Sequence, residues 1–478
     1  MTYDLVLTGG FVVTPEGKGR WDLGVREGRV AAIGAPGSLV NEASDTRSIV
    51  DKVVVPGGID PHVHCDALVE EAQGGTFFRT GSSADVSRAA LWGGTTTLID
   101  FAWRESQEDI SQTLKRYLAK WNNGCYCDYS FHITLRGELA APLLSQIPDT
   151  IRAGYPSFKV FTTDVFPPPR APVGRVPYGS IKELLRWTAD HNGIVAVHAE
   201  DDDMVMHMYR KLIGEGRTGL ENMPNVHSAL SERVAIERVL TLAEHERGCI
   251  YLMHVSAGEG VEAISGARSR GVAVYGETLP QYVLTTQDAY RADDGVKFHT
   301  YPSLKSQLDV NSLWRGVRDG SISTFATDEM WTPYATKLAG TRIDNAVGGH
   351  TGVETRLALV YTEVVDRQRL GVEKFVQLTS TNAAKILGLY PQKGVIAVGS
   401  DADLAILEPN LDITLASRDL HESDYSPWEG YSVSVRPVMT LLRGKIVVEG
   451  GRFKGEASDG RPVYRKLAQS VPAGTASS

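Results

Sequence analysis

The sequence predicts an α/β protein: a (β/α)8 TIM-like barrel with a small β-sandwich domain built from both chain ends. Short β-rich segments alternate with longer helical patterns through the middle of the chain, which is typical of parallel βα units. Both ends instead alternate apolar and polar residues between glycine-rich turns, as short antiparallel strands do. The length of 478 residues accommodates one large barrel and an accessory domain.

The small domain is expected to have its first part over residues 1–56 and its second part over 390–454. The alternating pattern appears in "YDLVLTGGFVVTPEGKGRWDLGVREGRVAAIG" and again in "GVIAVGSDADLAILEP" and "PVMTLLRGKIVVEGGRFKG". Residues 455–478 are expected to form a carboxyl-terminal tail, because the final "SVPAGTASS" is poor in apolar residues.

Residues 57–389 are expected to form the barrel. The candidate strands are "GIDPHVH", "TTTLIDF", "DYSFHITL", "SFKVF", "IVAVHAE", "IYLMHVS", "VAVYGET" and "STFATDE". Helical patterns lie between several of them, as in "SQEDISQTLKRYLAKW", "GSIKELLRWTADHNG" and "NVHSALSERVAIERVLTLAEHERG". Eight β-units in about 330 residues are what a (β/α)8 barrel needs.

Composition and charge exclude several classes of protein. The net charge of −9 gives no basic footprint, so a nucleic-acid partner is not expected. No apolar run is long enough to span a membrane, and "MTYDLVLTGG" lacks the features of a signal peptide. The four cysteines, Cys65, Cys125, Cys127 and Cys249, are too few for a secreted disulfide scaffold. We therefore expect a cytoplasmic protein.

Histidines, a lysine and an aspartate stand where the predicted strands end. His62 and His64 lie two residues apart in "GGIDPHVHCD", so on a strand they point to the same side, roughly 6.6 Å apart. The plainer reading is a pair of surface histidines near a turn. Strand ends of a barrel form one face, however, so all these side chains are expected to meet there. The full set is His62, His64, Lys159, His198, His254 and Asp328.

Lys159 is the unusual member of this set, because an ammonium beside metal cations is unfavourable. Burial and nearby positive charge both favour the neutral amine. A neutral amine reacts with carbon dioxide to give a carbamate, whose two oxygens can bridge two cations as a carboxylate does. Imidazole and carboxylate ligands suit zinc, although other divalent ions also fit. The predicted cofactors are two divalent metal ions, with zinc favoured, and an N6-carboxylated Lys159.

Several motifs resemble the amidohydrolase superfamily, and specifically its hydantoinase/dihydropyrimidinase family. The segments that carry the resemblance are "PGGIDPHVH", "SFKVF", "VHAE", "MHVS" and "ATDE", in this order. "WGGTTTLIDF", "GETLPQYV", "GGHTGVETRL" and "STNAAKILGLYPQKGVIAVGSDADLAIL" are similar to that family too. The resemblance runs from about Tyr3 to about Lys454, nearly the whole chain.

The resemblance implies a dinuclear metal-dependent hydrolase that opens a C–N bond of a cyclic amide or ureide. His62, His64, carboxylated Lys159 and Asp328 would hold one metal, and Lys159, His198 and His254 would hold the other. A metal-bridging hydroxide would attack the amide carbonyl, with Asp328 as the catalytic proton shuttle. It also implies a homo-oligomer, either a tetramer or a dimer.

Four substrate-side positions depart from the family pattern. Asp164 stands where the family usually has a tyrosine, Tyr301 replaces a serine, Glu329 replaces a histidine, and Thr351 replaces an asparagine. We predict that these four residues contact the substrate. Tyr301 is a candidate donor in place of the missing tyrosine.

The two added carboxylates, Asp164 and Glu329, have two interpretations. Facing the site, they would favour a substrate with a cationic or donor-rich group. Turned away, they would pair with loop arginines such as Arg170 or Arg175. Both arginines belong to the proline-rich loop of residues 166–177, which is either a binding loop or a plain surface connection.

Other functions remain open at this point. One is a related amidohydrolase on a different C–N substrate, either allantoinase-like or acting on an unusual heterocycle or imide. Another is a non-catalytic scaffold like the collapsin response mediator proteins, which have lost metal ligands; the presence of all six ligands argues against it. A mononuclear deaminase generally does without the bridging lysine, so Lys159 argues against that reading.

Overall fold

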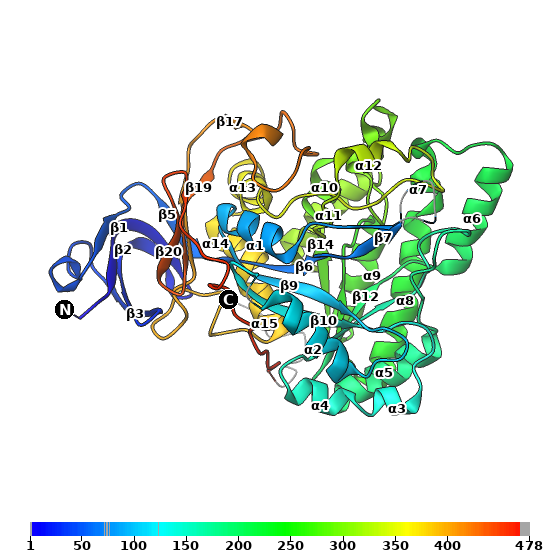
Figure 1. Cartoon of the computed structure of the whole chain (residues 1–478), viewed down its shortest axis with the longest axis horizontal. Coiled ribbons are helices and arrows are strands. Elements are labelled where there is room, and N and C mark those ends of the chain that lie inside the picture. The colour runs from blue at the N-terminus through cyan, green and yellow to red at the C-terminus, as the bar shows by residue number, and fades with distance from the viewer. Residues whose placement is uncertain (1, 71, 73–74, 76, 123, 469–478) are drawn as a thin grey trace.

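The computed structural model describes residues 2–70, 72, 75, 77–122 and 124–468. It contains a barrel of parallel strands wrapped by helices and a separate sheet beside it (Figure 1). This confirms the predicted fold class: strands from both chain ends build the extra sheet. Residues 469–478, the end of the predicted tail, lie outside the described part of the chain. The domain boundaries drawn from the sequence stay a proposal.

Eight parallel strands form the barrel, in the order β15-β14-β13-β12-β11-β10-β9-β6. The seam between the first and last strands is closed by hydrogen bonds: the Glu329 amide donates to the His62 carbonyl at 3.2 Å, and the His64 amide donates to the Glu329 carbonyl at 2.7 Å. Every strand predicted for the barrel is present. They are β6 (Gly58–Val63), β9 (Thr95–Trp103), β10 (Asp128–Thr134), β11 (Ser157–Phe161), β12 (Ile194–His198), β13 (Ile250–Leu252), β14 (Val274–Thr278) and β15 (Ile322–Phe325).

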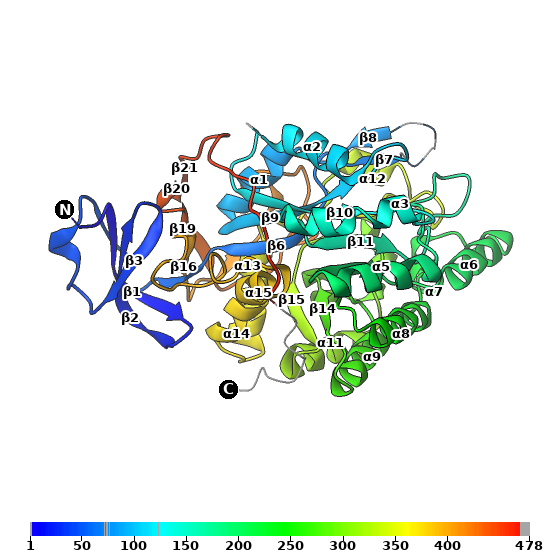
Figure 2. The same cartoon turned by 90° about the horizontal axis from the view of Figure 1, so that it is seen from below.

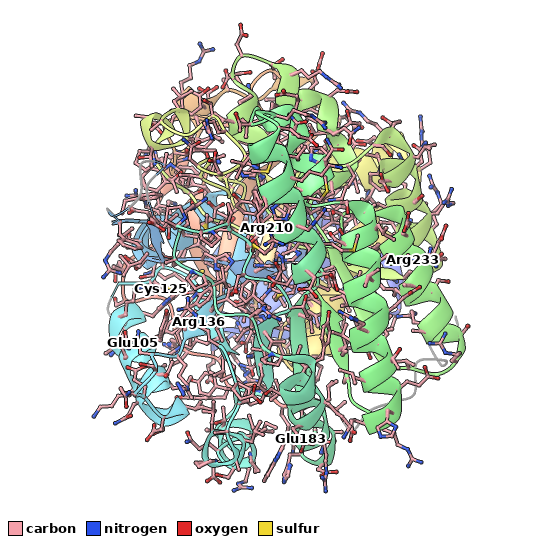
Figure 3. All side chains as sticks on the ribbon, turned by 90° about the vertical axis from the view of Figure 1, so that its right-hand side faces the viewer. Glu105, Cys125, Arg136, Glu183, Arg210 and Arg233 are labelled. Atoms are coloured by element: carbon pink, nitrogen blue, oxygen red, sulfur yellow. The ribbon has the colours of Figure 1, made fainter. Side chains whose placement is uncertain are left out.

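Helices cover the outside of the barrel (Figures 1 and 2). Charged side chains such as Glu183, Arg210 and Arg233 line the outer surface of the helical layer (Figure 3). The helices are α1 (Ser83–Trp92), α2 (Ile110–Trp121), α3 (Ala141–Leu144), α4 (Ile147–Arg152), α5 (Tyr178–Asp190), α6 (Asp202–Gly214), α7 (Met223–Val226), α8 (Ala229–Glu246), α9 (Gly258–Ser269), α10 (Pro280–Leu284), α11 (Gln307–Asp319), α12 (Tyr334–Leu338), α13 (Arg356–Tyr361), α14 (Val372–Val376) and α15 (Asn382–Leu387).

Local sequence explains where the longer helices begin and which face they bury. Asp109 and Ser306 each form a capping box at the start of α2 and α11, which satisfies otherwise unpaired amides. α2 buries Ile110, Leu114 and Trp121 at helical spacing against the barrel. Short 3₁₀ segments are η1 (Val40–Glu42), η2 (Leu220–Asn222), η3 (Gln287–Arg291), η4 (Gly295–Phe298) and η7 (Ser417–Asp419); π-helical segments are η5 (Thr362–Arg367) and η6 (Gln377–Thr381).

The second sheet has nine strands and draws on both chain ends. Its halves join where β5 pairs antiparallel with β16, Val54 facing Ile406. Alternate residues enclose a core of their own, with Leu23, Val54 and Leu404 fully buried. The strands are β1 (Leu5–Thr14), β2 (Gly17–Arg26), β3 (Arg29–Gly34), β4 (Thr46–Ser48), β5 (Val53–Pro56), β16 (Leu404–Glu408), β19 (Arg436–Leu442), β20 (Lys445–Glu449) and β21 (Arg452–Phe453).

Two small ribbons stand apart from these sheets. β7 (Leu68–Glu70) pairs with β8 (Phe77–Arg79), and β17 (Ile413–Thr414) pairs with β18 (Ser432–Val433). Between β17 and β18 the chain reaches the barrel, where the Thr351 hydroxyl donates to Glu422 at 2.9 Å. A segment expected in the small domain thus covers part of the barrel loops. Among the described residues, no helix has both the length and the hydropathy to cross a membrane.

A buried cluster of charges joins the small sheet to the barrel. The Lys393 Nζ lies 2.7 Å from Asp128 of β10 and 3.2 Å from Asp401, and it also contacts Asp403. The three aspartates lie close enough together to hold a metal ion. The lysine ammonium takes that place, and the three carboxylates outweigh burial and raise the pKa of Lys393.

The chain after β21 runs back along the barrel and inserts Arg465 near the starts of β10 and β11. This guanidinium is 2% exposed. It donates to the Ser130 hydroxyl at 2.9 Å and the Ser157 hydroxyl at 2.7 Å, and also to the Phe131 carbonyl. Residues 455–468 are therefore part of the packed structure.

Replacing this arginine is expected to destabilise the fold. An Arg465→Ala variant loses several hydrogen bonds and leaves a cavity, so its free energy of unfolding should fall by about 3 kcal/mol. Urea unfolding followed by tryptophan fluorescence measures the change. Lys466→Ala, at the exposed neighbouring position, is the control. If the two variants unfold within about 0.5 kcal/mol of each other, Arg465 has no such role.

Candidate metal centre

The six predicted ligands come from five strands and lie at one mouth of the barrel. His62 is in β6, Lys159 in β11, and His198 ends β12. The others lie just past strand ends: His64 is one residue after β6, His254 two residues after β13, and Asp328 three residues after β15. Because all eight strands are parallel, their carboxyl ends share one face, and residues far apart in sequence become neighbours.

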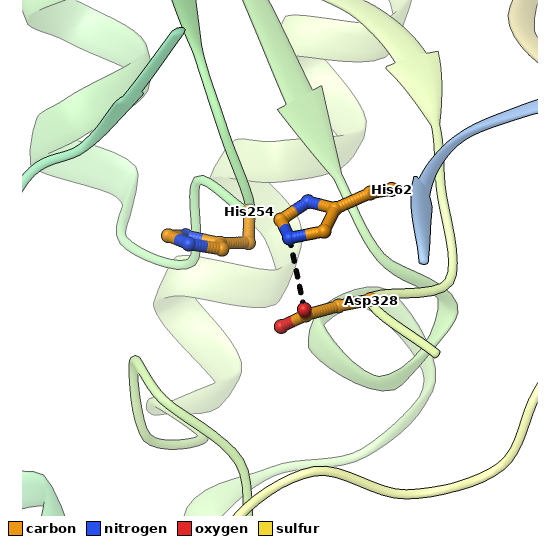
Figure 4. A group of neighbouring side chains, drawn as sticks. All are labelled: His62, His254 and Asp328. Atoms are coloured by element: carbon orange, nitrogen blue, oxygen red, sulfur yellow. Dashed lines mark ion pairs between the residues drawn. The ribbon is translucent and has the colours of Figure 1, made fainter. Parts of the chain in front are cut away.

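One oxygen of Asp328 faces two imidazoles. Its Oδ1 lies 2.9 Å from His62 Nε2 and 3.2 Å from His64 Nε2. Figure 4 shows His62 and Asp328 facing each other, with His254 beside them. The ligand atoms of these three lie within 4.8 Å of one another, close enough to hold a single ion. Nitrogen and carboxylate ligands at this spacing fit a divalent metal such as zinc.

A second pair of ligand atoms lies beside the first group. His198 Nδ1 is 3.0 Å from His254 Nε2, and both rings are almost fully buried. Burial lowers the pKa of His198, and it holds the pKa of His254 well below the usual range. Two neutral imidazoles with ring nitrogens this close can both direct a lone pair to a second metal ion when one is bound.

The pKa of His62, which faces Asp328, shifts in the opposite direction. Burial disfavours a charged His62, but Asp328 and Glu277 outweigh it and raise its pKa to about 9. Burial also opposes ionisation of Asp328, yet His62 and His64 hold its pKa well below the usual range. This half of the site therefore favours positive charge, which a bound cation would supply in place of a proton.

Lys159 has the surroundings of a neutral amine. It is 1% exposed, and its Nζ lies 2.9 Å from Met253 Sδ. Nζ also lies 4.6 Å from the centre of the Phe161 ring. No carboxylate pairs with it among the residues that the structure describes. Burial lowers its pKa to about 7, although Asp328 and Glu277 oppose that shift. At neutral pH a large fraction of the amine is therefore unprotonated and able to react with carbon dioxide.

Two of the predicted ligands have strained backbone. His254 has a φ of 40° and Asp328 a φ of 53°, in the left-handed region that residues other than glycine rarely adopt. Such outliers cluster at functional sites, where the surrounding structure maintains them. Here the strain turns each side chain from its strand end into the mouth of the barrel.

Comparison with known proteins agrees with this geometry. The sequence profile of the Amidohydrolase family matches residues 53–447. The chain belongs to the amidohydrolase family. It is 33% identical to a D-hydantoinase of Ralstonia pickettii, covering 97% of this chain and 99% of that one. It is 32% identical to a D-phenylhydantoinase of Escherichia coli over 97% of this chain and 98% of that one.

Solved structures of similar proteins share the whole architecture. A D-hydantoinase from Bacillus sp. AR9 superposes with a TM-score of 0.91 at 30% identity, covering 98% of this chain and all of that one. A dihydropyrimidinase from Brevibacillus agri NCHU1002 gives a TM-score of 0.89 at 27% identity, with 97% and 99% covered. The predicted recognition of the hydantoinase/dihydropyrimidinase family is thus confirmed.

In this amidohydrolase, Asp164 has the contacts of a residue that stabilises a loop. Its Oδ1 accepts hydrogen bonds from the amides of Gly174 at 2.9 Å and Arg175 at 2.8 Å. Its Oδ2 lies 4.0 Å from the Arg175 guanidinium. Both contacts tie the proline-rich loop to the end of β11. They match the interpretation in which this carboxylate turns toward the loop, and a contact with substrate stays a prediction.

Glu329 and Thr351 lie in the loops that close the barrel seam. Glu329 is fully buried, and its Oε2 accepts from the amides of Gly352 at 2.6 Å and Val353 at 2.8 Å. Burial raises its pKa to about 8. The Thr351 hydroxyl donates a hydrogen bond to the Glu422 carboxylate. The expected alternative partners of Glu329, Arg170 and Arg175, form no ion pair with it in the described structure. The predicted substrate contacts of both residues stay untested.

Tyr301 packs in a group of aromatic rings. Its hydroxyl donates to the Ala346 carbonyl at 3.3 Å. Its ring lies 5.0 Å from that of His227, 4.6 Å from that of His299 and 5.2 Å from that of Phe166. The side chain is half-buried. These contacts fix the orientation of the Tyr301 ring. A contact between Tyr301 and the substrate stays a prediction.

Sequence reasoning missed the buried carboxylates that support the ligands. Glu277 of β14 accepts from His62 Nδ1 at 2.7 Å, the His254 amide at 3.0 Å and the Tyr251 hydroxyl at 2.8 Å. Glu200 accepts from His198 Nε2 at 2.8 Å. The available signal was a glutamate inside the apolar segment "VAVYGET" and another two residues after His198. A charged residue at such a position needs a buried partner.

Proposed function

We propose that this chain is a dinuclear metal-dependent hydrolase that opens a C–N bond of a cyclic amide or ureide, as the names of its hydantoinase relatives indicate for those proteins. His62, His64, carboxylated Lys159 and Asp328 hold one metal ion in this proposal. Lys159, His198 and His254 hold the other. The proposed ions are zinc.

The observation that carries the proposal is the meeting of four imidazoles, one carboxylate and one buried lysine at the mouth of the barrel. His62 and His64 share Asp328 Oδ1, while His198 and His254 face each other 3.0 Å apart. Lys159 is buried without an acid partner among the described residues. Hence two groups of ligands lie beside one amine that can be carboxylated.

The chain's own groups have distinct roles in this proposal. When bound, two divalent ions supply an activated water and polarise the substrate carbonyl. Asp328 accepts the proton of the attacking water and donates it to the leaving nitrogen of the opened ring. Glu277 orients His62, and the buried walls around Phe101 and Phe161 exclude bulk water from the lysine.

Neutralising the proposed proton shuttle should separate catalysis from metal binding. An Asp328→Asn variant is expected to lose about 10²–10⁴-fold in kcat, because general acid–base transfer of this kind contributes that much. Its metal content should stay near that of the parent protein. Steady-state hydrolysis and elemental analysis measure the two quantities. Asp203→Asn, at an exposed position of α6, is the control. Undiminished kcat in Asp328→Asn would remove Asp328 from this role.

A related amidohydrolase activity on a different C–N substrate is the second candidate. It is worth testing because four substrate-side positions differ from the family pattern: Asp164, Tyr301, Glu329 and Thr351. The deciding experiment is a turnover screen of metal-loaded protein over hydantoins, dihydropyrimidines, cyclic imides, allantoin and cationic heterocycles. Ring opening of a hydantoin or dihydropyrimidine supports the first proposal, and turnover of allantoin or a cationic heterocycle alone supports the second.

The assembly and surroundings of the enzyme belong to the proposal as well. We propose a homo-oligomer, a tetramer or a dimer, in the cytoplasm, with a small cyclic molecule as its substrate. Cys65, Cys125, Cys127 and Cys249 are all free thiols, in keeping with a reducing compartment. Light scattering of the purified protein measures the oligomeric state.

A further inference from the structure

A line of buried hydrogen bonds leads away from the metal-facing side of His198. His198 Nε2 lies 2.8 Å from one oxygen of Glu200, and the other oxygen lies 2.9 Å from His227 Nδ1. His227 Nε2 is in turn 2.9 Å from the Tyr209 hydroxyl. None of the four residues is more than 2% exposed. Water therefore does not compete for these contacts.

The order of donors and acceptors along this line is fixed by chemistry. An ionised carboxylate only accepts hydrogen bonds, so both histidine nitrogens that face Glu200 must carry a hydrogen. A neutral imidazole has one N–H and one lone pair. His198 must then keep its lone pair on Nδ1, the atom that lies 3.0 Å from His254 Nε2. His227 likewise keeps its lone pair on Nε2, where the Tyr209 hydroxyl donates.

The surroundings hold these groups in place. The Thr162 hydroxyl donates to the Glu200 carbonyl at 2.7 Å and accepts from the Glu200 amide at 2.9 Å. The Ser303 hydroxyl donates to the His227 carbonyl at 3.1 Å. β11, β12 and the chain before α8 are thereby tied together around the Glu200 carboxylate. The orientation of the His198 ring is thus set by a connected, buried network.

The other group of ligands has a separate support. Glu277 holds His62 through Nδ1 and is itself fixed by Tyr251. The two groups meet at His254, whose amide donates to Glu277 at 3.0 Å and whose Nε2 lies 3.0 Å from His198 Nδ1. Among the described ligands, Glu200 bonds through its carboxylate to His198, so a change in this support should weaken mainly the ion that His198 holds.

We propose that Glu200, His227 and Tyr209 are positioning residues that fix the tautomer and orientation of His198, and so set the affinity of one metal ion of the pair. The inference rests on the proposed dinuclear centre. It assigns a role to two residues, His227 and Tyr209, that are remote from the ligands in sequence and reach His198 through Glu200.

The test measures metal binding rather than turnover. Metal-free full-length protein is titrated with Zn²⁺ in competition with a chromophoric chelator, and with Co²⁺ while its visible absorption spectrum is recorded. In His227→Leu the affinity for one ion should fall by about 10–100-fold, and the affinity for the other should stay unchanged. The Co²⁺ spectrum should change in step with the weakened site.

Two further variants make the test specific. His227→Asn can still donate to Glu200 from an amide nitrogen near the Nδ1 position, so it should recover most of the lost affinity. Tyr209→Phe removes one hydroxyl and should weaken the same ion by a few fold. Tyr290→Phe is the matched control, because its buried hydroxyl accepts from the Leu304 amide at 3.0 Å, outside this line of hydrogen bonds.

The outcomes are distinct. Parental affinity for both ions in His227→Leu and Tyr209→Phe, with unchanged Co²⁺ spectra, would overturn the inference. Equal weakening of both ions would overturn it too, since that indicates general destabilisation. Should His227→Leu fail to fold, the Asn and Phe variants decide the matter. A parent protein that binds two ions but hydrolyses no cyclic amide would refute the proposed activity and leave this inference standing.

Discussion

A Lys159→Ala variant should lose turnover by about 10³-fold or more. Among the six proposed protein ligands, the carbamate on this lysine would be the one shared by both ions, and its loss removes several kcal/mol of charge stabilisation at the reacting carbonyl. The amine is buried and forms no ion pair with a carboxylate among the described residues, so no side chain there is placed to replace the bridge. Steady-state hydrolysis of the substrate found in the screen measures the effect, and elemental analysis should find fewer than two ions per chain.

Chemical rescue separates the bridge from a simple loss of folding. The cavity left by the lysine side chain admits a short carboxylic acid such as propionate, whose two oxygens can bridge the ions. Added propionate should therefore restore part of the activity of Lys159→Ala and leave the parent protein unchanged. Lys211→Ala, at an exposed position of α6, should behave like the parent. Full turnover in Lys159→Ala without added acid would refute the carbamate.

The largest effect on stability is expected at Lys393. A Lys393→Met variant leaves Asp128, Asp401 and Asp403 buried without their shared ammonium. Among the described residues, Arg443 is the one cation that stays paired with this cluster, through Asp128. Removing one partner of a buried ion pair lowers the free energy of unfolding by about 3–5 kcal/mol, since the remaining charge is uncompensated. Urea unfolding should therefore show a loss of that size. Lys445→Met, which removes an exposed lysine paired with Glu456 and Asp459, should cost less than about 1 kcal/mol.

The same variant should depend on pH in a defined direction. Burial already raises the pKa of Asp403, and removal of the lysine takes away a group that lowers it. An aspartate whose pKa in the folded protein exceeds its unfolded value of about 3.9 destabilises the fold once pH rises above that value. The deficit of Lys393→Met should thus shrink as pH falls from 8 toward 5. A deficit that grows on acidification would contradict this account.

Sequence patterns were sufficient for the barrel and for the set of proposed ligands. Strands of a parallel barrel end at one face, so a polar residue at a strand end, such as His198 or Asp328, can be placed there without coordinates. Alternation at both chain ends likewise predicted strands that assemble together. The extra sheet is one nine-stranded sheet joined through β5 and β16, which alternation alone does not specify.

Directions of side chains could not be predicted in the same way. Asp164 follows the fourth barrel strand, close to the mouth, yet its carboxylate caps amides of the loop at Gly174 and Arg175. A carboxylate accepts hydrogen bonds from whichever nearby N–H groups are otherwise unpaired. Which N–H groups are near depends on how the loop folds back. Sequence position alone gave no preference between the loop and the site.

By itself, the sequence determined the fold class, the family and the six residues proposed to bind metal, because strand periodicity and strand-end position are local properties. Only the tertiary structure decided what supports them: Glu277 behind His62, the line from Glu200 through His227 to Tyr209, and Arg465 beneath the barrel. These contacts join segments distant in sequence. Their existence depends on which buried donors and acceptors are left to satisfy one another once the chain has packed.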